Sequence, residues 1–175
     1  MLPTLITAAL AIVATLLGAI VSGRFQERAA ERQVRAAHGE AIRRDRLEAV
    51  TALACAASDH RRALWMRGDA VITQASPERI EALRGDSHMT RSAVTRPLVA
   101  LHVLCEDQAV RAAADRMITL TYAMRNACAT SEDLATAREA AKNAHDSFVN
   151  TAARYLSPAL PTGRAHLNPE QETTR

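Results

Sequence analysis

The chain has 175 residues and a formal net charge of +3, with 48% hydrophobic and only 3% aromatic residues. This length accommodates one membrane segment and one domain. A composition rich in alanine and poor in glycine and aromatic residues favours closely packed helices over a β-sheet. The three cysteines, Cys55, Cys105 and Cys128, are odd in number and widely spaced. They indicate reduced, buried thiols and argue against a disulfide framework or a cysteine metal site.

The first element is an uncharged apolar run from Leu2 to Val21. As a helix it would cover about 30 Å, the thickness of the bilayer hydrocarbon. Seven arginines follow the run and no basic side chain precedes it, so the positive-inside rule places the N-terminus outside and the rest of the chain in the cytoplasm. A cleaved signal peptide would need its basic residues before the apolar core. Residues 1–23 are therefore predicted to be a single-pass anchor in the inner (cytoplasmic) membrane.

Small residues line one face of this predicted anchor at four-residue spacing, namely Thr7, Ala11, Thr15, Ala19 and Gly23. Such rows let two helices approach closely in lipid, which favours a homodimer. An alanine-rich segment also produces such rows by chance, and this alternative stays open.

Residues 24–46 form a basic juxtamembrane segment with seven arginines and four acidic residues. Arg24, Arg28, Arg32 and Arg35 share one face of a helix continuous with the anchor, and Glu31 is placed to pair with Arg35. His38 and Gly39 are its weakest point. The arginine face suits anionic lipid headgroups or nucleic acid phosphates. The simpler interpretation is a solvated helix that sets the membrane topology.

Residues 47–157 are predicted to form an antiparallel bundle of about four helices. The first helix is predicted to end at Gly68–Asp69. Its core-facing positions are Leu47, Val50, Leu53, Ala54, Ala57, Arg61, Leu64 and Trp65. The second helix begins at Ser76–Pro77–Glu78, with a serine cap and proline in the first turn. Its apolar positions are Ile80, Leu83, Ala93 and Val94. Pro97 kinks or divides this helix, and the run Leu98 to Leu104 is taken as buried helix.

The third and fourth helices have clear apolar seams. The third starts near Asp107, with Val110, Ala114, Met117, Thr121, Met124 and Cys128 on its seam. The fourth follows a Thr130–Asp133 capping box, and its heptad positions are Leu134, Ala137, Ala141, Ala144, Phe148, Ala152 and Tyr155. Residues 158–175 contain prolines and no apolar period, which predicts a disordered tail.

The sequence contains no motif of a known chemistry. It has no phosphate-binding loop, no HExxH or CxxC metal motif, no Glu-x-x-His pair and no GxSxG elbow. Basic residues are not interleaved with aromatic ones, and no basic recognition helix is evident. No catalytic residue, cofactor or metal site is therefore predicted.

Two polar clusters interrupt the apolar pattern. One contains Asp59, His60, Arg61 and Arg62 with Trp65, and the other contains Asp86, Ser87 and His88 with Arg91. If their helices are antiparallel neighbours, the clusters lie near one level and form a recognition patch or a buried polar network. The alternative is ordinary surface histidines and solvated arginines.

These same stretches carry a resemblance. DHRRALW at 59–65 and DSHMTRSAVTRPL at 86–98, behind one N-terminal anchor, resemble the KilB proteins of conjugative plasmids from mycelial actinobacteria. The resemblance covers residues 1 to about 157. It implies a membrane-associated protein that helps plasmid spread through the recipient mycelium and harms the host when its expression is uncontrolled. It carries over no catalytic residue.

We therefore expect a non-enzymatic protein that acts by binding itself, as a dimer, and other plasmid transfer or septal proteins. The candidate contact residues are His60, Arg61, Trp65, Ser87, His88 and Arg91. Two alternatives stay open: a membrane-tethered DNA or lipid binder that uses the arginine face, in which nucleic acid is the less favoured ligand, and an enzyme built on His60 and His88.

Overall fold

The computed structural model describes the backbone of residues 2–157 and the side chains of residues 26, 28 and 30–157. Over that range it contains helices and no strand: α1 (Leu2–Ile72), α2 (Pro77–Leu104), α3 (Gln108–Ala123), the 3₁₀ turn η1 (Met124–Asn126) and α4 (Ser131–Leu156). The expectation of an all-α chain with four helices is confirmed. The side chains of the predicted anchor, Leu2 to Val21, and the whole predicted tail, 158–175, lie outside the described residues.

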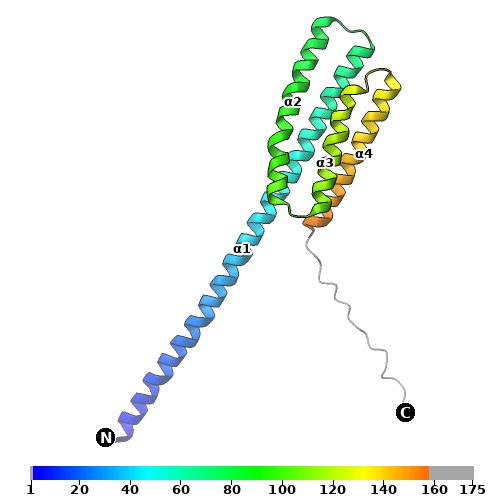
Figure 1. Cartoon of the computed structure of the whole chain (residues 1–175). Helices are drawn as coiled ribbons and strands as arrows, with labels where there is room; N and C mark the ends of the chain where they lie inside the picture. The colour runs from blue at the N-terminus through cyan, green and yellow to red at the C-terminus, as the bar shows by residue number, and fades with distance from the viewer. Residues whose placement is uncertain (1, 158–175) are drawn as a thin grey trace, which may run out of the picture. The chain divides into compact units, whose positions relative to one another are not determined.

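The chain divides into two compact units, Met1–Glu48 and Ala49–Arg175. In the second unit, α1 from Ala49 onward, α2, α3 and α4 lie side by side, and consecutive helices run in opposite directions (Figure 1). In the first unit, α1 is unbroken through His38 and Gly39. There the Arg35 guanidinium lies 3.0 Å from the Glu31 carboxylate, which is the predicted pair.

Each helix of the second unit that follows a connection begins with a side-chain cap. The Ser76 hydroxyl accepts a hydrogen bond from the Arg79 N–H at 3.3 Å, with Pro77 as the first helical residue. The Thr130 hydroxyl accepts from the Asp133 N–H at 3.0 Å, and both caps agree with the prediction. Asp107 caps α3 by accepting from the Val110 N–H at 2.9 Å. The caps satisfy backbone donors that have no partner within the helix.

One predicted helix boundary, at Gly68, is wrong, and of the two outcomes expected at Pro97, a kink or a division, the division is excluded. α1 continues past Gly68 to Ile72. It ends in a Schellman-type turn, in which the Ala75 N–H donates to the Ala70 carbonyl at 2.9 Å and Gln74 takes the left-handed conformation at φ 53°. Pro97 does not divide α2, which runs unbroken from Pro77 to Leu104. The run Leu98 to Leu104 is helical, as expected, but the prediction that it is buried is wrong for Val99 and Val103, which are 58% and 74% exposed.

The turn between α2 and α3 is held by Arg111. Its Nε donates to the carbonyl of Cys105 at 2.6 Å, and its Nη2 donates to the carbonyl of His102 at 2.9 Å. These carbonyls belong to the last turn of α2 and to the residue after it, where backbone acceptors have no partner inside the helix. A side chain of α3 therefore completes the end of α2.

The core of the second unit has two apolar clusters. The larger contains Val50, Leu53, Ala57, Val94, Leu101, Cys105, Val110, Ala114, Met117, Ile118, Ala144, Phe148 and Ala152. The smaller contains Leu64, Met124, Leu134 and Ala141. Most of the predicted seams of α3 and α4 are thus buried. Leu47, which precedes this unit, is 54% exposed and Ala93 is exposed too, so their predicted core positions are wrong.

A thin polar layer lies between the two clusters along α1 and α3, although Leu120 packs against both clusters. His60 lies between Ala57 and Leu64 on α1, and Thr121 lies between Ile118 of α3 and Met124 of η1. Both side chains are buried, as is Ser87 on α2. Every buried side-chain nitrogen or oxygen among the described residues has a hydrogen-bond partner, as a stable low-dielectric interior requires.

Gly68 is a packing residue, and this gives a testable contrast with Gly85. A Cβ at Gly68 would lie 2.8 and 2.9 Å from the two methyl groups of Leu134 and 3.3 Å from the Cys128 sulfur, whereas a Cβ at Gly85 meets nothing within 4 Å. Gly85→Ala should raise the free energy of unfolding by about 0.5–1 kcal/mol through helix propensity. Gly68→Ala should lower it by about 1–2 kcal/mol, because Leu134 is buried and overpacking outweighs the gain.

The measurement is chemical denaturation followed by the fluorescence of Trp65, the single tryptophan. An equal gain in stability from both substitutions would contradict the assignment of Gly68 to a helix contact.

Candidate functional site

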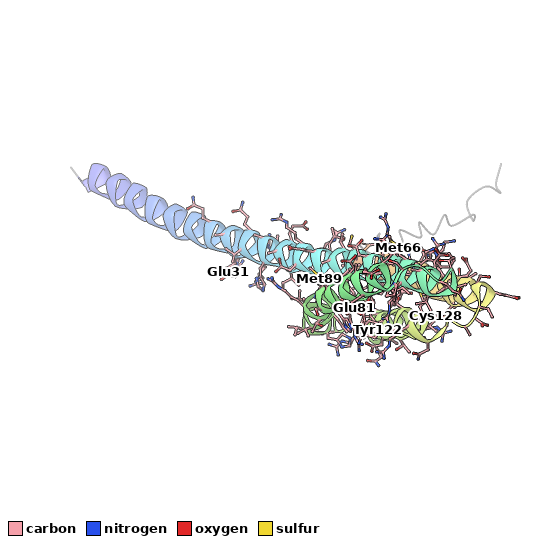
Figure 2. The ribbon with its side chains drawn as sticks, turned by 90° about the horizontal axis from the view of Figure 1, so that it is seen from above. Glu31, Met66, Glu81, Met89, Tyr122 and Cys128 are labelled. Atoms are coloured by element: carbon pink, nitrogen blue, oxygen red, sulfur yellow. The ribbon has the colours of Figure 1, made fainter. Side chains whose placement is uncertain are left out.

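His60 is the centre of the polar layer and joins three helices. Its side chain is 3% exposed, and Nδ1 lies 3.0 Å from the Thr90 hydroxyl of α2. The same hydroxyl lies 3.0 Å from the Asp86 carbonyl. It also lies 3.2 Å from the Ser87 carbonyl, so the Thr90 hydroxyl links the His60 ring to the backbone of α2. The ring also meets Tyr122 of α3 edge-on, with the ring centroids 5.3 Å apart; Figure 2 labels Tyr122.

Burial keeps His60 uncharged at neutral pH. Desolvation, and secondarily the positive charge of Arg91, lowers the pKa of His60 to about 4. An imidazolium at this position would be both desolvated and near a guanidinium. His60 is therefore a neutral hydrogen-bonding group in the bundle at pH 7.

A small basic cavity lies beside His60 and Tyr122. Its volume is about 20 Å³, and Arg67, Ser87, His88, Arg91 and Arg125 also line it. The Arg91 guanidinium stacks over the Tyr122 ring at 4.7 Å from the centroid, a favourable cation–π arrangement. The buried Ser87 hydroxyl is turned to its own helix and donates to the Arg84 carbonyl at 2.7 Å.

Arg61 and Trp65 face another helix. The Arg138 guanidinium of α4 lies 4.5 Å from the Trp65 ring centroid, and Arg61 donates to the Ser58 hydroxyl at 3.4 Å. Burial lowers the pKa of the Arg61 guanidinium, and the charges that act on it, those of Asp146, Arg138 and Glu139, belong to α4. These two residues thus belong to the α1–α4 contact and not to the cavity at His60.

Next to Arg61, three side chains lie in the order of a hydrolytic triad. Ser58 Oγ is 3.3 Å from His145 Nε2, and His145 Nδ1 is 3.3 Å from Asp146 Oδ1. Acyl transfer also requires backbone or side-chain donors for the oxyanion. Ser58 is in the interior of α1, where backbone N–H groups are bonded to carbonyls one turn earlier. The contact between Ser58 and His145 joins α1 to α4.

Of the six candidate contact residues, the structure brings four to one cavity: His60, Ser87, His88 and Arg91. Sequence reasoning missed the other polar groups around His60, namely Arg67, Thr90, Tyr122 and Arg125. Two signals were available in the sequence. Arg67 is seven residues after His60 and shares its helix face, and Tyr122 is one of only two tyrosines in the chain.

The juxtamembrane arginines are described in part. Arg28, Arg32 and Arg35 are exposed on α1, and the Arg24 side chain lies outside the described residues. Within the part of the chain that the structure describes, no helix is both long enough and apolar enough to cross a membrane. In the same part of the chain, no three histidine, cysteine or acidic side chains gather as metal ligands would.

The chain is similar to proteins of plasmid transfer. A family model described as KilB plasmid transfer protein matches residues 47–156. Protein KilB of Streptomyces lividans is 41% identical over 150 residues, which cover 86% of this chain and 97% of that protein. No solved structure matches the chain. The family model covers more than half of the chain, and the relative aligns with 86% of the chain. The chain therefore belongs to the KilB plasmid transfer protein family.

Proposed function

We propose that this chain acts in plasmid transfer, in the spread of plasmid through a mycelium, as a membrane-anchored protein that binds other proteins and catalyses no reaction. One observation carries the proposal. The family match at 47–156 coincides with the helical bundle of the second unit. The role named for the family is thus expected of the bundle. Residues 1–46 would then anchor the bundle at the membrane.

Exposed apolar side chains on α2 support binding to a protein. Met89, Val99 and Val103 are 73%, 58% and 74% exposed, and their spacing puts them within one broad face of the helix. Apolar groups gathered on an exposed helix face are typical of contact surfaces. The proposed partners are a second copy of the chain and other plasmid transfer or septal proteins.

The placement at a membrane rests on the sequence. The uncharged run from Leu2 to Val21 is long enough to span a bilayer, and the arginines that follow it favour a cytoplasmic bundle with the N-terminus outside. Damage to the host when expression is uncontrolled is part of the proposal only because the resemblance implies it.

The second candidate function is a membrane-tethered DNA or anionic-lipid binder that uses the face of Arg24, Arg28, Arg32 and Arg35. Its supporting observation is that three of these arginines are exposed. The ion pair between Arg35 and Glu31 reduces the free positive charge of that face, so this candidate is less favoured.

The test compares the full chain with a chain that starts at Arg24, expressed in the host. We expect the full chain in the membrane fraction and the truncated chain in the soluble fraction, helical and inactive in plasmid spread. Spread supported equally by the truncated chain would overturn the role of the anchor. A full-length variant with the four arginines replaced by glutamate separates the two candidates: normal spread favours the protein-binding function, and loss of spread with intact membrane placement favours the arginine face.

A further inference from the structure

Three arginines from three different elements line the small cavity beside His60. Arg67 comes from α1, Arg91 from α2 and Arg125 from η1. His88 adds a fourth basic side chain, and no aspartate or glutamate is among the lining residues. The cavity volume of about 20 Å³ is enough for one water-sized group. His60, Leu64, Ser87 and Tyr122 complete the lining.

Within residues 30–157, none of these three arginines forms an ion pair with an acidic side chain. The ion pairs found there involve Glu31, Glu40, Glu81, Asp115, Glu139 and Asp146 with other partners. Arg91 is held in place by its stacking on Tyr122. Like charges around one cavity disfavour one another, and an anion in their midst reverses the sign of that interaction.

We propose that this cavity binds a phosphate group. One phosphate oxygen would occupy the cavity, and the others would meet the guanidinium groups at its mouth. Arginine is suited to this task because its planar fork forms paired, charge-assisted hydrogen bonds to oxyanions. A carboxylate presents two oxygens in one plane, whereas donors contributed by three separate elements match a tetrahedral anion better. The bound group can be free phosphate, a phosphomonoester or the phosphodiester of a lipid headgroup.

The proposal goes beyond the proposed function and does not depend on it. It concerns the bundle and not the anchor or the face of Arg24 to Arg35. A phosphate bound here would connect α1, α2 and η1 through one ligand. The bundle would then be more stable in its presence.

The experiment is a titration of the full chain in uncharged detergent with inorganic phosphate, followed by calorimetry and by the thermal midpoint, with chloride at matched ionic strength as the reference. We expect saturable binding and a rising midpoint with phosphate alone. Arg125→Gln should weaken binding about tenfold, because a charge-assisted hydrogen bond is lost. Arg116→Gln is the matched control: it removes the same charge from an exposed position on α3 that does not line the cavity.

Because Arg125 is exposed, its substitution should leave the fold intact, and circular dichroism can verify this. His88→Gln provides a second variant at an exposed position that lines the cavity. The proposal is overturned if phosphate acts no differently from chloride, or if Arg116→Gln weakens binding as much as Arg125→Gln. Glycerol 3-phosphate and dimethyl phosphate identify the source. Competition by the monoester alone supports a small phosphorylated ligand, and competition by both supports a lipid headgroup.

Discussion

Phe148→Ala should lower the free energy of unfolding of the bundle by about 3–5 kcal/mol, the usual cost of removing a buried phenyl ring. Phe148 is fully buried in the larger apolar cluster, where it lies with α1, α2 and α3 residues such as Leu53, Leu101 and Met117. Its neighbours are held by three different helices and cannot all collapse into the space. Since a domain of this size is stable by about 5–15 kcal/mol, this one change removes a large share of the total.

The measurement for Phe148→Ala is urea denaturation followed by Trp65 fluorescence. Val149→Ala is the control, because Val149 is the next residue on the same helix and is 38% exposed. It should change the stability by less than about 1 kcal/mol. A loss below 1 kcal/mol for Phe148→Ala would show that the ring is not at the centre of the core.

Mild acid should destabilise the bundle through His60. Its pKa is about 4 in the folded chain against 6.5 for an ordinary histidine. Above pH 6.5 the imidazole is neutral in both states and the folded state has its full stability. As the pH falls from 6.5 toward 4, the unfolded chain takes up the proton first, so stability is lost in that window. The expected loss between pH 7 and pH 5 is about 2 kcal/mol.

The measurement is the urea midpoint at pH 7, 6 and 5, compared between the natural chain and His60→Gln. The variant removes the titrating group, so its stability should fall much less over this range, although it is less stable at pH 7. His38→Gln, at an exposed position of the first unit, should keep the natural pH dependence. Equal losses from pH 7 to pH 5 in the natural chain and in His60→Gln would contradict the assignment.

The fold was predictable where one helix face has a single apolar seam. α4 shows this best: Leu134, Ala141, Ala144, Phe148 and Ala152 are all buried as its heptad predicts. The caps at Ser76 and Thr130 depend only on local hydrogen bonds, so their positions were also correct. The errors come from tertiary contacts. Gly68 has the sequence context of a helix end, yet it lies inside α1, where the absence of a side chain leaves room for Leu134 of α4.

The candidate site was predictable only in part, because neighbouring residues of one helix point in different directions. His60 and Arg61 are adjacent in sequence and about 100° apart around α1. His60 faces Thr90 and Tyr122, while Arg61 is turned toward α4. The sequence pattern placed both in one cluster. Which face meets which helix is decided by the order of helices around the bundle, and that order does not appear in the period of any single helix.

The clamp formed by Arg111 makes the two ends of the bundle differ in their tolerance of inserted residues. Its hydrogen bonds to the carbonyls of His102 and Cys105 span a connection of three residues between α2 and α3. An added residue there would move the carbonyls away from the guanidinium and break both hydrogen bonds at the end of α2. The connection from Thr73 to Ser76 has no such side-chain bridge between the helices that it joins. Length variation among relatives, and loops grafted by design, should therefore accumulate at the α1–α2 end and not at the α2–α3 end.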